Sequence, residues 1–310
     1  MSAAREPAVW RIARGENGYP AALLDLEGDA PDALYGCGSQ RLVRELDREG
    51  TVTIVGSRHP SAYGLEMAEE LGHLLAAAGL VVVSGMALGI DAATHRGALA
   101  GNGDTVAVLG GGPDFIYPRS ERRLYERILA KGAIVSEVPP GTAPGPGCFP
   151  KRNRIMAALA AMTVVVEAAE PSGSLITARR AFELGRDVGA VPGRATSRVA
   201  KGTNALLADG AAVVRDAQDV LDVLLGVGVT AARRSGPPLE PELARVADAV
   251  DGGAATPDAV ALAAGIETSD AAVALARLEL LGYLRVDVAG RYERTALSLP
   301  GEEAATTLSP

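Results

Sequence analysis

Six short runs of apolar, mostly β-branched residues recur along the first two thirds of the chain. They begin near residues 51, 80, 105, 133, 163 and 187 and read TVTIVGS, LVVVSG, TVAVLGGG, AIVSE, TVVVEA and DVGAVPG. Strands that are apolar on both faces are covered on both sides, which is typical of a parallel sheet. Segments with one apolar helical face, such as residues 64–78, separate the runs. The alternation predicts a doubly wound α/β domain with a mostly parallel sheet.

The sequence divides into five parts around this pattern. Residues 1–50 form an N-terminal stub of mixed composition with a short helical piece near residues 41–48. Residues 51–230 carry the strand and helix alternation, which we expect to close with a last helical unit around a short AAVV strand. Residues 231–241, AARRSGPPLEP, have the composition of a linker. We expect a small domain over residues 242–297 and a disordered tail over residues 298–310.

The small domain resembles a winged helix-turn-helix. Helices are predicted over residues 242–250, from Pro257 behind the capping residue Thr256, and over residues 269–281. A hairpin, LRVDV–AG–RYERT, follows them. The apolar residues of the third helix fit packing within the domain, and they are Val273, Leu275, Leu278 and Leu281.

Acidic residues are concentrated in this C-terminal part. The whole chain has a net charge of −8, and residues 236–310 hold 12 Asp and Glu against 5 Lys and Arg, which gives −7 for that segment. Such a surface repels nucleic acid, whose affinity for proteins depends on neutralised phosphates. We therefore expect no DNA binding by residues 236–310, although a winged helix commonly binds duplex DNA.

Four of the predicted strands end in turns rich in glycine and serine. Carboxyl ends of parallel strands meet at one edge of the sheet, where open α/β sheets bind their ligands. Backbone N–H groups at helix starts make such an edge a site for phosphate. The candidate binding residues in these turns are Gly56, Ser57, Arg58, Ser84, Gly85, Gly111, Gly173 and Ser174.

The segment FPKRNR, residues 149–154, places an aromatic side chain directly before a basic cluster. A stacking face beside cations is the arrangement that binds single-stranded nucleic acid. We expect a helix from Ile155 onward, so that the cluster lies just before the helix and meets the Ser-Gly-Ser turn at the sheet edge. The candidate binding residues here are Phe149, Lys151, Arg152 and Arg154.

Each of these residues also has a structural interpretation. Phe149 could pack under the sheet, and Arg154 could pair with Glu167 or Glu170. The Asp91 carboxylate could act as a base, but capping of the helix that starts there explains it better.

Several classes of protein are disfavoured by the motifs. The chain has no GxGxxG after its first strand, no GxxxxGK[ST] and no GxSxG elbow with a suitable histidine. Two cysteines and three histidines lack the spacing of a metal site, so we expect neither metal nor cofactor. The N-terminus has no signal-peptide pattern and no apolar run is long enough to cross a membrane, which predicts a cytoplasmic protein without a membrane partner.

A series of longer motifs follows in order along the chain. They are GSR at 56–58, SGMALGIDAATHRGAL at 84–99, AVLGGG and IYP within 107–118, SEVPPG at 136–141, FPKRNRIMA at 149–157, VVVEAAEPSGSLITAR at 164–179 and VPG at 191–193. Together they resemble the DNA processing protein A (DprA/Smf) family over roughly residues 19–225. The sequence departs from the family pattern at Leu88, where an Arg is usual, at residues 145–147, where a cation usually precedes the Phe, and in its short N-terminal part.

The resemblance implies an extended Rossmann fold that binds single-stranded DNA at the sheet edge described above. It also implies a non-enzymatic protein that protects incoming DNA and loads the RecA recombinase in natural transformation. Arg58, Phe149 and the basic residues behind it would contact the DNA. A homodimer contact would involve the closing unit of the sheet, at Leu206, Leu207, Val213 and Val214.

Two other functions are consistent with parts of the sequence. A nucleotide-phosphate-binding enzyme of the lysine-decarboxylase-like Rossmann type would use the same glycine-rich edge. The signature of that enzyme type places a catalytic Glu on the helix that follows a strand equivalent to the run beginning near residue 163. In this sequence the corresponding residues 172–182 contain no acid. The second alternative is an adaptor whose C-terminal domain binds protein.

Overall fold

A computed structural model of the chain describes residues 7–226, 239–286 and 290–294. The chain divides near residue 229 into two compact units, a larger and a smaller one. The turn of the predicted hairpin, most of the predicted linker and the predicted disordered tail lie outside the described residues.

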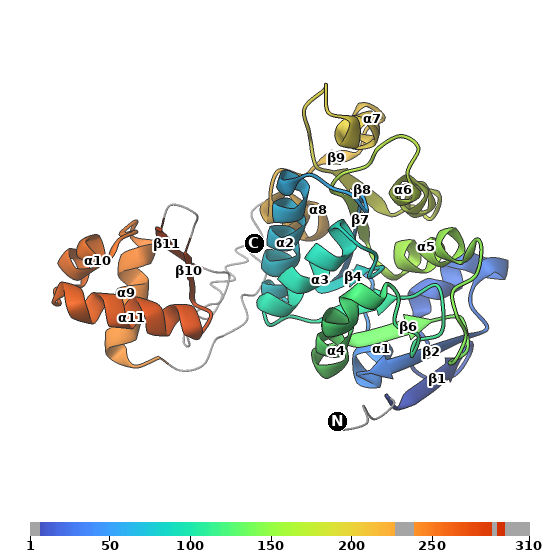
Figure 1. The fold of residues 1–310 in the computed structure, drawn as a ribbon, viewed down its shortest axis with the longest axis horizontal. Helices are drawn as coiled ribbons and strands as arrows, with labels where there is room; N and C mark the ends of the chain where they lie inside the picture. The colour runs from blue at the N-terminus through green and yellow to red at the C-terminus, as the bar shows by residue number, and fades with distance from the viewer. Residues whose placement is uncertain (1–6, 227–238, 287–289, 295–310) are drawn as a thin grey trace, which may run out of the picture. The chain divides into compact units, whose positions relative to one another are not determined.

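The larger unit is built on a nine-stranded, mostly parallel sheet with the strand order β1-β2-β6-β5-β4-β3-β7-β8-β9 (Figure 1). All six predicted runs form strands, and the sheet confirms the mixed α/β fold with a Rossmann-like core. The bounds are β1 Val9–Ala13, β2 Ala33–Gly38, β3 Thr51–Val55, β4 Val81–Ser84, β5 Thr105–Val108, β6 Ala133–Ser136, β7 Met162–Val165, β8 Asp187–Ala190 and β9 Ala212–Val213.

The first two strands come from residues 1–50, where the sequence analysis expected no strand. β1 pairs antiparallel with β2, and β2 pairs antiparallel with β6, so this segment extends one edge of the parallel sheet. β1 lies at the edge and β2 contains two glycines, Gly36 and Gly38. Neither strand resembles the β-branched runs of the parallel strands, because β1 has an exposed face at the sheet edge and β2, although mostly buried, contains glycine and no β-branched residue.

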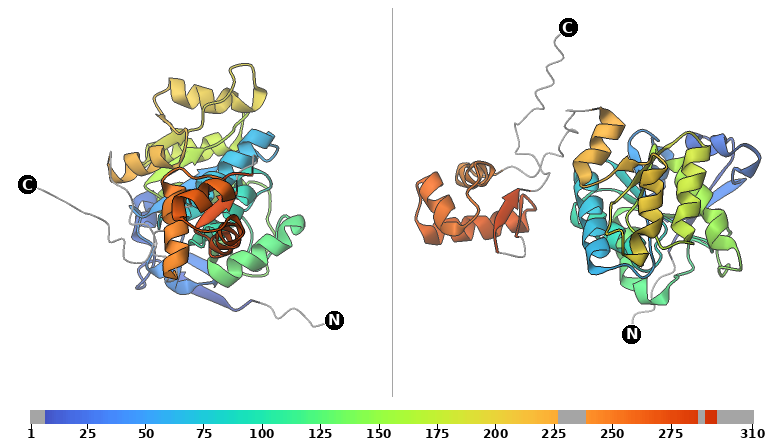
Figure 2. Two further views of the ribbon diagram at one scale, coloured as in Figure 1. Left: turned by 90° about the vertical axis from the view of Figure 1, so that its left-hand side faces the viewer. Right: turned by 90° about the horizontal axis from the view of Figure 1, so that it is seen from above.

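Helices cover both faces of the sheet (Figures 1 and 2). Helices α2, α3 and α4 lie on one face, whereas α5 and α6 lie on the other. From β3 to β6 the chain moves along the sheet in one direction, and from β6 to β9 it moves in the opposite direction. Because the crossovers are right-handed, the two directions place their helices on opposite faces. The bounds in this unit are α1 Gln40–Arg44, α2 Ala62–Ala77, α3 Ile90–Ala100, α4 Arg122–Lys131, α5 Cys148–Leu159, α6 Gly173–Glu183, α7 Lys201–Ala208 and α8 Ala217–Leu225, with 3-10 helices η1 Ala21–Asp29, η2 Arg119–Glu121 and η3 Arg198–Ala200.

The smaller unit contains α9 Pro241–Asp251, α10 Pro257–Ala264, α11 Thr268–Leu280, β10 Leu284–Val286 and β11 Tyr292–Arg294, and the two strands pair antiparallel. Its three predicted helices are confirmed, and the Thr256 hydroxyl accepts a hydrogen bond from Ala259 N at 3.4 Å as the cap of α10. Leu275 and Leu278 are buried in its core as expected. The prediction for Val273 is wrong, because its side chain lies on the outer face of α11 and is 61% exposed.

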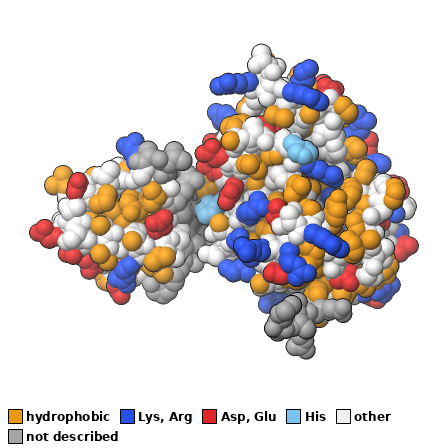
Figure 3. Space-filling view, viewed as in Figure 1, with side chains coloured by type: hydrophobic (Ala, Val, Ile, Leu, Met, Phe, Trp, Pro, Cys, Tyr) orange, Lys and Arg blue, Asp and Glu red, His pale blue; other side chains and the backbone are white. Residues whose placement is uncertain are grey.

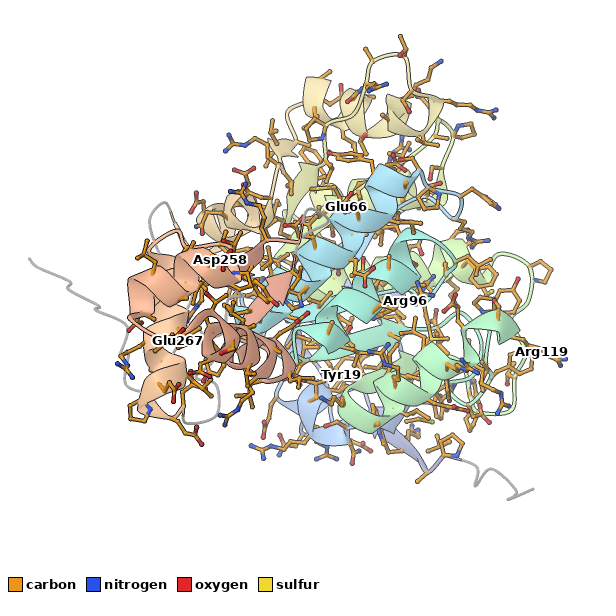
Figure 4. All side chains as sticks on the ribbon, turned by 60° about the vertical axis from the view of Figure 1, so that its left-hand side comes forward. Tyr19, Glu66, Arg96, Arg119, Asp258 and Glu267 are labelled. Atoms are coloured by element: carbon orange, nitrogen blue, oxygen red, sulfur yellow. The ribbon has the colours of Figure 1, made fainter. Side chains whose placement is uncertain are left out.

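The acidic residues of the smaller unit gather at helix starts. Glu242 and Asp270 lie in the first turns of α9 and α11, and Figure 4 labels Asp258 and Glu267, which stand at the starts of α10 and α11. Carboxylates at these positions stabilise the positive end of each helix dipole. Part of the negative charge of the segment therefore has a structural cause. On the face shown in Figure 3, apolar side chains gather over this unit with acidic ones around them.

No single helix within the described ranges is long and apolar enough to cross a membrane. Helices α10 and α11 together have a suitable length and composition, but they are bent by 106° at the loop that joins them.

Candidate functional site

The direction of winding reverses between the neighbouring strands β3 and β7. The chain leaves β3 toward α2 on one face of the sheet and leaves β7 toward α6 on the other, so the two loops diverge and open a crevice at the carboxyl edge. A cavity of about 380 Å³ occupies this position, and we name it the switch-point pocket. Its lining residues are Val55, Gly56, Ser57, Arg58, Ala87, Asp91, Phe149, Pro150, Arg152, Asn153, Met156, Ala169, Pro171, Ser172, Gly173, Ser174 and Thr177.

Helix α5 supplies one wall of the pocket. It begins at Cys148, seven residues before the predicted start at Ile155. Pro150 lies in the first turn, where a helix needs no backbone N–H, so the proline does not end the helix. The pocket-lining residues Phe149, Arg152, Asn153 and Met156 have the spacing i, i+3, i+4 and i+7 and thus share one face of the helix.

Arg152 lies at the bottom of this wall, with only 4% of its surface exposed. Its Nη1 donates to the carbonyl of Gly85 at 2.9 Å and also to the carbonyl of Val108. A Cβ at Gly85 would lie 2.3 Å from this Nη1, so only glycine leaves room for the guanidinium. Burial lowers the pKa of Arg152 to about 10, although the Asp91 carboxylate opposes the shift. The side chain thus remains a buried cation at neutral pH.

Asp91 faces this cation from the first turn of α3. Burial raises the pKa of its carboxyl group, while Arg152 and a hydrogen bond from Ala87 N at 3.4 Å counteract the rise. The expected capping role is not seen, because Gly89 is the N-cap of α3 and the Asp91 carboxylate accepts from Ala87 N, which lies before the helix. The carboxylate also serves as the counter-ion of Arg152.

Arg58 and Phe149 line the mouth of the pocket, and Tyr117, which is outside the lining, packs against Phe149. The guanidinium carbon of Arg58 lies 5.0 Å from the ring centre of Phe149, and the ring of Tyr117 lies 5.6 Å from the same ring. Phe149 is half-buried at the pocket and does not pack under the sheet. Sequence reasoning missed Tyr117, which is brought here from 32 positions upstream of Phe149 by the loop before η2. The IYP motif was its only signal.

The start of α6 forms the opposite wall. Ser172 is the N-cap, and its hydroxyl oxygen accepts from Ser174 N at 3.3 Å. Two buried polar atoms of pocket-lining residues, Thr177 Oγ1 and Arg152 Nε, have no hydrogen-bond partner among the described residues. Buried polar atoms are usually hydrogen-bonded, so these two atoms have a hydrogen-bonding capacity that no described residue uses. The pocket therefore combines the N–H groups at the start of α6 with one such polar atom from each wall, Thr177 Oγ1 from α6 and Arg152 Nε from α5.

The loop that carries Arg58 is fixed to the end of β7 by Glu167. The Glu167 carbonyl accepts from Ser57 N at 2.7 Å, and its carboxylate accepts from Ser61 N at 2.8 Å and from the Ser61 hydroxyl at 2.7 Å. On the other side, Gly89 has a φ of +80°, and a Cβ there would lie 2.4 Å from the carbonyl oxygen of Ser57. Both ends of the loop are thus held, which positions Arg58 over Phe149.

Arg154 and Lys151 lie on the other side of α5. The Arg154 guanidinium donates to both carboxylate oxygens of Glu137, at 2.8 and 2.7 Å, and to the carbonyl of Asp29. Lys151 Nζ lies 3.5 Å from Glu137 as well. The expected pairing of Arg154 with Glu167 or Glu170 is wrong. The helical phase of α5 also places Lys151 and Arg154 outside the lining of the switch-point pocket.

Other predicted residues fall into two groups. Gly56, Ser57, Gly173 and Ser174 line the pocket with Arg58. Ser84 is buried and donates to the carbonyl of Ile54 at 2.6 Å, Gly85 accepts from Arg152, and Gly111 packs against Pro144. These last three residues shape the surroundings of the pocket without lining it.

The residues predicted for the dimer contact differ in exposure. Val213 is 51% exposed, while Leu206 and Leu207 are half-buried. Val214 is fully buried within the chain, so it has no surface to offer a partner and that part of the prediction is wrong. Within the ranges that the structure describes, no group of three or more His, Cys, Asp or Glu side chains is placed to hold a metal ion.

The fold and the pocket together define a Rossmann-like protein with a cation-lined, nucleotide-sized pocket at its switch point. Residues 10–225 match the family described as DNA recombination-mediator protein A. The chain belongs to this family.

Similarities to individual proteins agree with that assignment. The putative DNA processing protein DprA of Mycobacterium tuberculosis is 40% identical over 261 residues, which are 82% of this chain and 67% of the relative. The X-ray structure of DNA processing protein A from Streptococcus pneumoniae has a TM-score of 0.64 and 39% identity and covers 70% of this chain and 74% of its own. The Helicobacter pylori structure, described for its single-stranded DNA binding mode, has a TM-score of 0.62 and 32% identity and covers 70% and 95%.

The Glu137–Arg154 pair generates a prediction on stability. Burial favours a raised pKa for Glu137, but the hydrogen bonds and charge of Arg154, with the charge of Lys151, lower it below the usual 4.5. A lowered carboxyl pKa stabilises the fold above about pH 4.5, and this contribution is lost as the pH falls below that value. We expect Glu137→Gln to reduce the free energy of unfolding by about 3 kcal/mol at pH 7, with a smaller deficit at pH 4.

Denaturant unfolding of both proteins between pH 3.5 and 7 measures this difference. Glu126→Gln is the matched control, because Glu126 pairs with Arg122 at 3.4 Å on the surface, and such pairs contribute about 0–1 kcal/mol. A deficit for Glu137→Gln that stays constant with pH would contradict the assignment.

Proposed function

We propose that this chain binds single-stranded DNA in the switch-point pocket, acts as a cytoplasmic recombination mediator, and loads the RecA recombinase in natural transformation. The observation that carries the proposal is the arrangement of Arg58 over Phe149 at the mouth of a pocket whose interior holds Arg152 and the start of α6. Membership of the family and the single-stranded DNA binding mode described for the Helicobacter pylori protein support it. Recombinase loading would be measured as faster RecA filament assembly on protein-coated single strands.

The shape of the pocket favours single strands over duplex. A base must be turned out of its stack to reach Phe149, and a duplex loses base pairing and stacking when that happens. In a single strand the bases are free to stack on an aromatic ring while cations follow the phosphates.

The first test is a titration of the full chain with single-stranded and blunt duplex DNA of equal length. We expect single-stranded DNA to bind more tightly, and log affinity to fall with log salt concentration by about 0.7 for each neutralised phosphate. Equal affinity for the two forms would overturn the proposal.

Arg58 should contribute most among single side chains. It is exposed at the pocket mouth and has no ion pair with any described carboxylate, so its charge is available to a phosphate. Loss of one charge-assisted contact costs about 1.5–3 kcal/mol, and Arg58→Ala should therefore weaken binding about tenfold or more.

Arg179→Ala is the matched control for Arg58→Ala. Arg179 is an exposed arginine of α6 that does not line the pocket. We expect its removal to change the dissociation constant by less than threefold. If Arg179→Ala weakened binding more than Arg58→Ala, the DNA would lie along the outer face of α6 instead.

We propose a homodimer that forms through the closing unit of the sheet. Val213 on the edge strand β9 supports this contact, because an exposed valine on an unpaired edge offers both apolar surface and free backbone groups. We expect a dimer by sedimentation at tens of micromolar and a monomer for Val213→Asp, with Val9→Asp on the opposite edge strand as control. A monomeric wild-type chain, with and without DNA, would contradict the proposal.

We propose a winged-helix-like domain with a role in protein contact for the smaller unit. In a DNA-reading winged helix the third helix carries cations, whereas the outer face of α11 presents Val273 and Leu280. The unit has its own core, so residues 236–310 can be studied alone. We expect this segment to bind neither single-stranded nor duplex DNA at low salt, and micromolar binding would show that its fold outweighs its net charge of −7.

A further inference from the structure

A second cavity lies beside the switch-point pocket at the carboxyl edge of the sheet. It has a volume of about 750 Å³ and is formed by the start of α2, the end of β7 and the loop after β8. We name it the Tyr63 pocket. The end of β7 is shared by the two cavities, since Ala169 lines the first and Glu167 lines the second. The two cavities therefore adjoin the same end of β7.

An aromatic ring and a cation are available in the Tyr63 pocket. The Tyr63 side chain is 47% exposed, and its hydroxyl donates to the carbonyl of Pro192 at 3.3 Å, which holds the ring against the loop after β8. Arg194 of the same loop is exposed and has no ion pair within the part of the chain that the structure describes. A half-exposed ring beside an uncompensated cation matches the requirement of a stacked base with its phosphate.

The Glu167 carboxylate adds a hydrogen-bond acceptor to this pocket. Glu167 is 4% exposed, and each of its carboxylate oxygens accepts one hydrogen bond from Ser61. A carboxylate can accept about four hydrogen bonds, so it retains capacity for a donor from a ligand. Among DNA bases, carboxylates accept from exocyclic amino groups, as on cytosine N4. Thymine offers no such group.

We propose that the Tyr63 pocket is a second nucleotide subsite for the same DNA strand, and that it favours a base with an exocyclic amino group over thymine. In this subsite the base stacks on Tyr63, its amino group donates to Glu167, and Arg194 contacts the phosphate. The proposal rests on the proposed function, because it requires that the chain binds single-stranded DNA in the first place.

The test uses the full chain and an oligothymidylate in which one thymidine is replaced, position by position, by cytidine or by an abasic residue. For the wild type we expect one position at which cytidine strengthens binding severalfold over thymidine, separate from the position read by the switch-point pocket. Tyr63→Leu should weaken binding about tenfold and remove the effect of the base at that one position only. Thermal unfolding checks that the variant is folded.

Arg194→Gln should weaken binding independently of the base, and Arg198→Gln, an exposed arginine of η3 outside the lining, should have no effect. The subsite would be overturned if the affinity of the wild type responded to substitution at only one position of the oligonucleotide. It would also be overturned if Tyr63→Leu bound the DNA within twofold of the wild-type affinity. Equal affinities for cytidine and thymidine at the second position would overturn the role of Glu167. If free deoxycytidylate bound saturably while Tyr63→Leu left the affinity for single-stranded DNA unchanged, the pocket would be assigned to free nucleotides instead. A wild type that binds no single-stranded DNA refutes the proposed function itself.

Discussion

The site depends on the hydrogen bonds that fix the β3–α2 loop to the end of β7. The backbone and side chain of Glu167 hold Ser57 and Ser61 at the two ends of that loop, and Arg58 stands between them. Because β3 and β7 are neighbours from which the chain winds in opposite directions, this bridge spans the topological switch point. Both cavities adjoin this bridge. Its geometry therefore sets the position of Arg58 at the mouth of the switch-point pocket and of the Glu167 carboxylate in the Tyr63 pocket.

The helical phase of α5 decides which basic residues line the switch-point pocket. Arg152 points into the switch-point pocket, whereas Arg154, two residues later, points to Glu137 and fixes the helix to the rest of the larger unit. A segment that looks like one basic cluster in the sequence therefore divides into Arg152, which lines the pocket, and Arg154, which anchors the helix. Arg152 itself is held by carbonyl oxygens and by the Asp91 counter-ion, which keeps a buried cation charged inside the fold.

Local patterns were sufficient to predict the six parallel strands, the three helices of the smaller unit and the meeting of the FPKRNR segment with the Ser-Gly-Ser turn. The antiparallel pair β1 and β2 escaped prediction because β1, at the sheet edge, has an exposed face and β2 contains glycine and no β-branched residue. The start of α5 escaped it because Pro150 resembles a breaker unless its place in the first turn is known. Tyr117, Thr177 and the Glu137 partner of Arg154 depend on contacts between distant segments, which spacing along the sequence does not encode.

The proposed function requires that one nucleotide of a single strand occupies the switch-point pocket. A crystal structure of the full chain with a short oligothymidylate tests it most directly. We expect a phosphate within hydrogen-bond distance of Arg58 or of the N–H groups at the start of α6, and a nucleotide atom or ordered water bonded to Thr177 Oγ1 and Arg152 Nε. A strand bound elsewhere on the chain, with Arg58 still stacked on Phe149 and no nucleotide in the pocket, would contradict the account.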